Sequence, residues 1–190
     1  MARGRVRTLP RGGRGKRADV SADLSRIKHF ASTIQDSASG ALRFLKGGAG
    51  KLTFSGDNTY TDVTAINGGI LEITGSIASA TTLNRGSIAG DGTLTGDLTI
   101  NAGATLLPLQ PTPFVTGSIT LNGALEIADI ETLPPAIYTL FTCGGGVANN
   151  DAAIANMPDN SRCNYRLSVV NNATTVVLRV TAHGTQVIVR

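Results

Sequence analysis

The sequence is poor in the residues that mark several protein classes. Trp is absent, aromatic residues make up 4% and charged residues 16% of the 190 residues, whereas an average soluble domain is about 25% charged. A disordered chain would carry more charge and fewer aliphatic residues, and a disulfide scaffold would need more than the two cysteines present. No apolar run approaches the ~18 residues of a membrane helix. We therefore expect an ordered chain with no membrane span.

Glycine and aliphatic residues are abundant instead. The chain has 23 Gly and is 41% hydrophobic, which is enough for a sizeable core, and its length fits one domain with or without an appendage. Many Gly, Thr and Asn residues beside few aromatics indicate short strands joined by turns. The composition therefore predicts a mainly β fold.

The net charge of +4 hides a basic head on a mildly acidic body. Residues 1–46 carry eleven Lys or Arg and three Asp, whereas residues 47–190 carry six basic and ten acidic residues. Residues 1–17 hold seven basic residues, four Gly and no acid, so like charges and backbone entropy oppose folding of this segment alone. We predict a basic arm over residues 1–17 that pairs with phosphate or acidic groups.

An apolar heptad pattern follows the arm in residues 18–46. The apolar positions are spaced alternately four and three residues apart, at Val20, Leu24, Ile27, Ala31, Ile34, Ala38, Ala41 and Leu45. This spacing is typical of an amphipathic helix or a coiled-coil seam, and Gly47 and Gly48 would end it. We predict a helix whose apolar side lies against another copy, the body of the chain or a partner.

Residues 47–190 contain a repeat. Four segments, 64–75, 81–92, 98–109 and 119–130, each have a strand, then Asn, then Gly within two positions, then a second strand. The asparagines are Asn67, Asn84, Asn101 and Asn122, at steps of 17, 17 and 21. Asn and Gly suit tight bends, and a near-constant step favours a short β-solenoid over an antiparallel sandwich of hairpins. We therefore predict a parallel β-solenoid body with a strand-rich C-terminal cap over residues 47–190.

The segment GAGKLTFSGDNTYTDVTAINGGILEITG (48–75) carries a recognisable motif. It resembles the passenger-associated repeat of bacterial autotransporters, and the matching residues are Gly50, Leu52, Ser55, Gly56, Asn58, Thr59, Tyr60, Thr61, Thr64, Gly69 and Leu71. Residues 138–147 and 165–182 are similar to the C-terminal end of such passengers. The resemblance implies a right-handed parallel β-helix that is surface-exposed and often adhesive.

The sequence also departs from that family. Asp62 and Val63 stand where the family usually has Gly, residues 18–30 are too polar for a secretory signal, and no segment is left for a translocator barrel. Because repeats of this style also occur in phage virion proteins, which need no export signal, our first prediction is a virion component: a capsid decoration, head or tail fibre protein. The alternative is a bacterial cell-surface adhesin from an autotransporter passenger, and a polysaccharide-cleaving β-helix is a third reading.

The predicted virion role places docking in the head. The arm would pair with an acidic shell surface or packaged nucleic acid, and apolar helix residues would complete the contact. The body would project, with a trimer as the guessed oligomer and a host surface as a further contact. The docking residues that we predict are Arg3, Arg5, Arg7, Arg11, Arg14, Arg17, Leu24, Ile27, Ile34 and Leu45.

Catalytic and metal-ligating patterns are weak. Cys143 and Cys163 have no CxxC or Cys/His partner, so we predict no zinc site and leave open whether they form a disulfide. Asp57, Asp62, Asp91 and Asp97 are the only acidic group worth testing for paired-carboxylate catalysis or calcium, but each lies beside a turn residue or at a strand edge. We therefore predict a non-enzymatic structural protein without a cofactor or metal.

Overall fold

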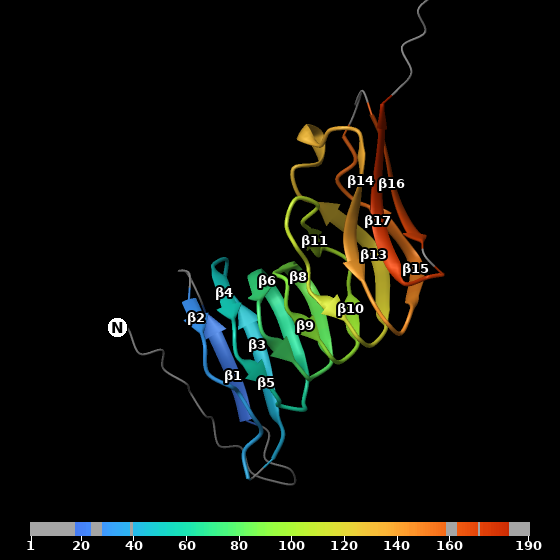
Figure 1. Ribbon diagram of the computed structural model, residues 1–190. Coiled ribbons are helices and arrows are strands. Elements are labelled where there is room, and N and C mark those ends of the chain that lie inside the picture. Colours follow the sequence, from blue (N-terminus) through green and yellow to red (C-terminus); the bar gives the residue numbers. More distant parts are fainter. Residues whose placement is uncertain (1–17, 24–27, 39, 159–162, 171, 183–190) are drawn as a thin grey trace, which may run out of the picture.

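The computed structural model describes residues 18–23, 28–38, 40–158, 163–170 and 172–182, and within strands 18–23 and at residue 28 it describes the backbone only. The chain is mainly β, with 59% strand and a parallel β-solenoid of about four turns. Successive rungs stack along one axis from β1 to β15, and an antiparallel sheet follows at the far end (Figure 1). The predicted β-solenoid is confirmed.

The described residues form three sheets. The largest has ten strands and is parallel throughout; it contains β1 (Ala18–Asp23), β2 (Lys28–Phe30), β3 (Leu42–Gly47), β4 (Lys51–Phe54), β6 (Thr64–Ile73), β8 (Thr81–Ala89), β10 (Leu98–Ile100), β11 (Thr105–Leu106), β13 (Ile119–Ile127) and β15 (Val147–Ile154). The second is parallel and contains β5 (Asp57–Asn58), β7 (Ser76–Ile77), β9 (Thr93–Leu94) and β12 (Phe114–Val115). The third is antiparallel and contains β14 (Ala136–Thr142), β16 (Cys163–Val170) and β17 (Thr175–Ala182).

The central rungs, from β3 to β12, contribute strands to three faces of the solenoid. The ten-stranded sheet supplies two of them, because a long strand such as β6 pairs with β3 through its first half and with β4 through its second half. We call these halves the first and second faces, and the β5–β7–β9–β12 sheet the third face. Where β6 passes from the first to the second face, its register with β8 shifts at Asn67. The Asn-Gly segments of the sequence therefore mark a corner of the solenoid.

Alternation of inward and outward side chains builds one continuous core. On the first face the register stacks Ile66, Leu83, Ile100 and Leu121 in a column, and all four are fully buried. Ile77, Leu94 and Val115 make the corresponding column of the third face. Because successive side chains of a strand point to opposite sides, the intervening threonines of the first face point outward and stay half-buried.

Aromatic side chains fill the core of the first rungs. The ring centroids of Phe44 and Phe54 lie 4.8 Å apart, those of Phe30 and Phe54 lie 6.0 Å apart, and Tyr60 follows at 6.4 Å from Phe44. The Tyr60 hydroxyl shares a hydrogen bond with Thr64 Oγ1, and burial raises the pKa of Tyr60 to about 12. The phenol therefore stays neutral inside the solenoid and keeps this bond.

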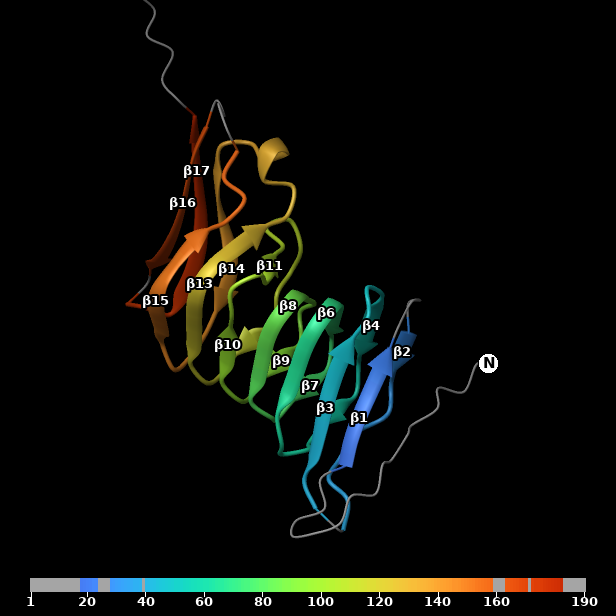
Figure 2. The ribbon, with the colours of Figure 1, turned by 180° about the vertical axis from the view of Figure 1, so that it is seen from behind.

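The antiparallel sheet covers the C-terminal end of the rungs. In both views β14, β16 and β17 lie at the same end of the solenoid as β13 and β15 (Figure 2). Leu140, Phe141, Val176 and Leu178 are buried in the same apolar cluster as the rungs. A short 3₁₀ turn, η1 (Ile130–Thr132), precedes this sheet and buries Ile130. The sheet thus shields core residues of the last rung from water.

The amphipathic helix predicted for residues 18–46 is wrong for the described part of that segment, which contains β1, β2 and β3. In β3 the side chains of Leu42, Phe44 and Lys46 are buried and the intervening ones are half-buried, a period of two in place of the heptad. The helix was marginal by itself, whereas the parallel strands β1 and β6 on either side of β3 supply its backbone partners. Tertiary pairing therefore overrides the local pattern.

Successive rungs pack closely at some turns, and alanine variants of two glycines can measure how much this close packing contributes to stability. Gly86 and Gly103 have nearly the same φ, +82° and +84°, but a Cβ on Gly86 would lie 2.3 Å from the Gly69 carbonyl oxygen, whereas on Gly103 the nearest atom is 4.0 Å away. We expect Gly103→Ala to lower the free energy of unfolding by about 1–2 kcal/mol, the cost of a left-handed L-residue. Gly86→Ala should lower it by a further ~1–3 kcal/mol through overpacking. Equal losses in chemical denaturation would contradict this stacking.

Candidate functional surface

An asparagine ladder runs along the corner between the first and second faces. Asn84 Nδ2 donates to Asn67 Oδ1 at 2.9 Å, Asn101 donates to Asn84 at 2.8 Å, and Asn122 donates to Asn101 at 2.9 Å. Asn150 extends the ladder by donating to Asn122 Oδ1 at 3.0 Å. The four repeat asparagines singled out in the sequence therefore stack directly on one another.

Sequence reasoning missed the fifth member of the ladder. Asn150 lies 28 residues after Asn122, so it falls outside the steps of 17 to 21 that define the other members. In the sequence, the only signal of this ladder position was the Asn149–Asn150 pair, which follows a short β-type run. The extra residues between the two ladder members form the excursion through β14, which leaves the rung and joins the antiparallel sheet.

A buried lysine lies next to the first position of the ladder. Lys46 and Ile66 are register partners, so Gly47 stands where Asn67 stands one rung later. Lys46 is fully buried, and its Nζ donates to the carbonyl oxygens of Gly47 at 2.8 Å, Gly48 at 3.0 Å and Gly68 at 2.9 Å. An ammonium has three protons to donate, so these three acceptors match its capacity. Lys46 thereby ties the turn of one rung to the turn of the next.

Two lysines test whether the Lys46 contacts stabilise the fold. Lys46→Met keeps the apolar stem but leaves three carbonyl oxygens without this donor, and we expect a loss of about 3 kcal/mol in the free energy of unfolding. Lys51→Met, the matched control, removes an ion pair at a side chain that is 35% exposed, so its cost should stay below ~1 kcal/mol. Denaturant titration of both variants decides; a Lys46 variant as stable as the Lys51 variant would refute the role.

The ladder also predicts unequal losses of stability for two asparagine-to-alanine variants. Asn101 makes two ladder hydrogen bonds, whereas Asn67 makes one, to Asn84. Asn101→Ala should therefore cost about 2 kcal/mol of unfolding free energy, and Asn67→Ala about 1 kcal/mol. Thermal and denaturant unfolding of the two variants measure the difference. A larger loss from the Asn67 variant would argue against stacked amides as a stabilising interaction.

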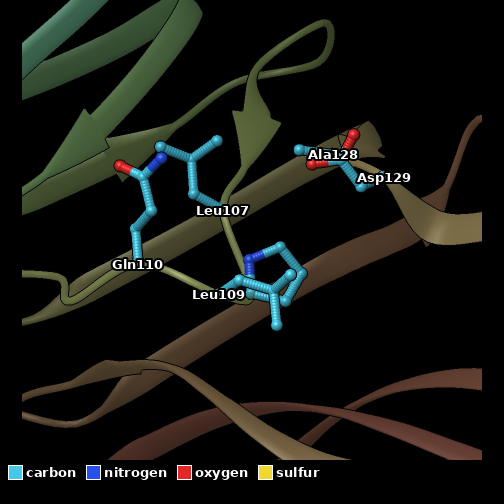
Figure 3. Close-up of a pocket in the computed structure, with 6 residues that line it drawn as sticks. Leu107, Leu109, Gln110, Ala128 and Asp129 are labelled. Carbon is cyan, nitrogen blue, oxygen red and sulfur yellow. The ribbon is translucent and has the colours of Figure 1, made fainter. Parts of the chain in front are cut away.

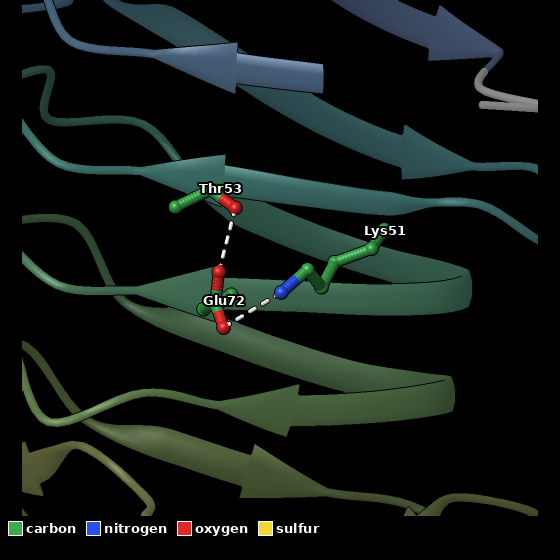
Figure 4. A network of polar contacts seen from close by, with 3 residues as sticks. All are labelled: Lys51, Thr53 and Glu72. Atoms are coloured by element: carbon green, nitrogen blue, oxygen red, sulfur yellow. Dashed lines mark hydrogen bonds and ion pairs between the residues drawn. The ribbon is translucent and has the colours of Figure 1, made fainter. Parts of the chain in front are cut away.

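A polar cluster lies on the outer side of the second face, in the first rungs. Lys51 Nζ donates to Glu72 Oε1 at 2.9 Å, and Thr53 Oγ1 donates to Glu72 Oε2 at 2.7 Å, so the carboxylate is held from two alternate, outward positions of β4 (Figure 4). The hydrogen bond from Lys51 has the larger effect and the one from Thr53 the next, and both lower the pKa of Glu72. His29 Nε2 lies 2.7 Å from Ser55 Oγ on the same face. The cluster pairs its charges internally and presents hydroxyl groups.

The four aspartates considered for catalysis are spread over separate turns. Asp57 accepts from Ser76 Oγ at 2.9 Å, and Asp62 accepts from the backbone N–H of Val63 at 2.8 Å. Asp97 accepts from the backbone N–H of Ser118 and from its hydroxyl, and these two bonds lower its pKa. Each of these three carboxylates thus bonds to its own turn or to the neighbouring rung.

A small hollow lies on the C-terminal half of the second face. It is lined by Leu107, Pro108, Leu109, Gln110, Ala128 and Asp129 (Figure 3). Four of its six lining residues are apolar, and one of them, Leu109, is 65% exposed. Among the described residues, no group of three or more His, Cys, Asp or Glu side chains is placed to hold a metal ion.

The predicted docking residues fall into two sets. Ile34 packs half-buried against the core, and Leu45 is half-buried on β3, where it pairs with Ala65 of the next rung; both belong to the rungs. The remainder lie outside the described residues: Arg3, Arg5, Arg7, Arg11, Arg14, Arg17, Leu24 and Ile27. Docking through the head stays a prediction.

The disulfide between Cys143 and Cys163 is not formed. Cys143 follows β14, whose last residue pairs with Thr175, whereas Cys163 pairs with Ala182 at the other end of β17. Seven residues of extended strand span roughly 23 Å, whereas a disulfide needs Cα atoms within about 7 Å. The register of the antiparallel sheet therefore keeps the two sulfur atoms apart.

Comparisons with known proteins agree with this architecture. The model of the passenger-associated transport repeat matches residues 44–73, the segment from β3 to β6. The chain is 44% identical over 66 residues to the protein named adhesin BmaC autotransporter from Brucella suis biovar 1 (strain 1330). That alignment covers 35% of this chain and 2% of the relative, so the chain spans a small part of that protein. The resemblance found in the sequence is confirmed.

Within residues 18–182, apart from the gaps given above, no helix has the length and apolarity needed to cross a bilayer.

Proposed function

We propose that this chain is an adhesive segment of a bacterial surface protein of the autotransporter passenger type, and that it acts by binding instead of catalysis. The observation that carries the proposal is the repeat match over residues 44–73, which coincides with a fully stacked pair of rungs. The adhesin name of the relative supports the same reading. No comparison supports the virion role, so the cell-surface alternative replaces it.

The faces of the solenoid suit contact over an extended area. On the first face the register aligns Thr82, Thr99 and Thr120 as an outward row. We call these three residues the threonine row. Parallel strands lie about 4.8 Å apart, so the row presents evenly spaced hydroxyl and methyl groups on an uncharged strip. Such a regularly spaced row, whatever its curvature, can bind a repetitive polar surface through many weak contacts, which suits adhesion.

The binding test uses the full chain and separates its two candidate binding surfaces, the basic arm and the threonine row. Labelled protein is applied to cultured mammalian cells, and bound label is measured against protein concentration. We expect saturable binding that disappears when the chain is unfolded beforehand. A variant with Arg3, Arg5, Arg7, Arg11, Arg14 and Arg17 changed to Gln should still bind, and binding should resist added salt, because salt screens a charged arm more than a neutral face. Equal binding by folded and unfolded protein would refute an adhesive fold.

Point variants then locate the binding surface. Thr99→Arg puts a bulky charge in the middle of the threonine row and should lower bound label at least about fivefold, a loss of about 1 kcal/mol or more. Thr93→Arg is the matched control, because Thr93 points outward from the third face and is half-buried like Thr99. A loss caused by Thr93→Arg and not by Thr99→Arg would move the contact to the third face.

A further inference from the structure

Two of the five ladder asparagines are followed by glycine: Asn67 by Gly68, and Asn122 by Gly123. An Asn-Gly pair is chemically labile, because glycine has no side chain to hinder attack of its backbone nitrogen on the neighbouring amide carbon. The two pairs occupy different places in the ladder. Asn67 is at its first position and exposed, and Asn122 is an internal member and half-buried.

The hydrogen bonds at the two sites differ in one respect. Both amides accept through Oδ1, Asn67 from Asn84 and Asn122 from Asn150. Asn122 Nδ2 also donates to Asn101 Oδ1 at 2.9 Å. Within the described part of the chain, Asn67 Nδ2 donates to no acceptor, because Gly47 occupies the preceding ladder position and has no side chain. The Asn67 amide is thus held by one hydrogen bond, at its oxygen, whereas the Asn122 amide is held by two, at its oxygen and at its nitrogen.

We propose that Asn67 is a site of spontaneous deamidation, and that the ladder protects Asn122 from the same reaction. The Gly68 backbone nitrogen attacks Asn67 Cγ, a C–N bond forms, the Cγ–Nδ2 bond breaks, and ammonia leaves with the proton from the Gly68 N–H. Water then opens the succinimide ring at either carbonyl and yields aspartate or isoaspartate. The net reaction consumes one water and releases one ammonia, without a redox change.

The ladder acts on the step in which the ring closes. To reach the next backbone nitrogen, the side-chain amide must rotate out of the plane of the stack. Asn67 breaks one hydrogen bond in doing so, and Asn122 breaks two. Asn67 therefore combines a labile sequence with an amide that is held by a single ladder hydrogen bond.

The products have different consequences at the two positions. A carboxylate at position 67 still offers an oxygen to Asn84, so the ladder survives and the exposed end gains a negative charge. A carboxylate at position 122 would have no N–H group to donate to Asn101 Oδ1. The aspartate product at position 67 is thus compatible with the folded chain, and the reaction does not depend on the proposed adhesive function.

The experiment follows both sites in one sample. Full-length protein is incubated in mildly alkaline buffer well below its melting temperature, and peptide mass spectrometry measures the mass gain of deamidation at positions 67 and 122 over time. We expect position 67 to react about fivefold faster in the folded chain, the factor expected for one hydrogen bond, and the two sites to react at similar rates in denaturant. Equal rates in the folded protein would overturn the proposal.

Two variants test the cause. Gly47→Asn supplies the missing acceptor; Gly47 does not have a positive φ, and a Cβ there meets nothing within 4 Å. This change should slow position 67 about fivefold, whereas Gly47→Ala should not. Asn101→Ala removes the acceptor of Asn122 Nδ2 and should speed position 122, whereas Asn84→Ala breaks the ladder elsewhere and should leave position 122 unchanged. If the deamidation rates of these variants correlate with their melting temperatures and not with the ladder contacts that each variant adds or removes, the mechanism is wrong.

Discussion

Backbone hydrogen bonding between successive parallel rungs is the interaction on which the rest of the structure depends. It fixes each rung directly over the previous one, for example Thr64 over Thr81 and Thr81 over Leu98. Parallel strands in register lie about 4.8 Å apart, so equivalent side chains must touch. Only side chains that interact well with their own kind suit such columns, and this requirement explains aliphatic columns inside and amide columns at the corner.

The corner shows how the same constraint selects residues that hydrophobicity alone would not. An asparagine can donate to one copy of itself and accept from another, so a column of asparagines satisfies its own polar groups at a bend where strand bonds are interrupted. Where the column begins, Gly47 replaces asparagine and Lys46 supplies the donors from within. The outward positions of the first face carry threonines at Thr82, Thr99 and Thr120, the surface on which the proposed binding contacts would lie.

The sequence predicted the body well because its signals repeat. Asn67, Asn84 and Asn101 recur at the rung length, and a recurrent position in a solenoid must stack. Asn150 was missed because the excursion through β14 breaks the step, and Lys46 was assigned to a helix because its buried state depends on carbonyl oxygens from two turns. The helix itself was wrong for a related reason: β3 gains its partners from β1 and β6, which no local spacing reveals.

Nuclear Overhauser contacts between side-chain amides test the stacked-rung architecture most directly. The structure predicts cross-peaks linking the amide protons of Asn84 to Asn67, Asn101 to Asn84, Asn122 to Asn101, and Asn150 to Asn122, with no direct contact between Asn67 and Asn122. Observation of this chain of contacts would establish the register of the rungs from β6 to β15 at once. Their absence, or contacts between asparagines that are not neighbours in the ladder, would contradict the account.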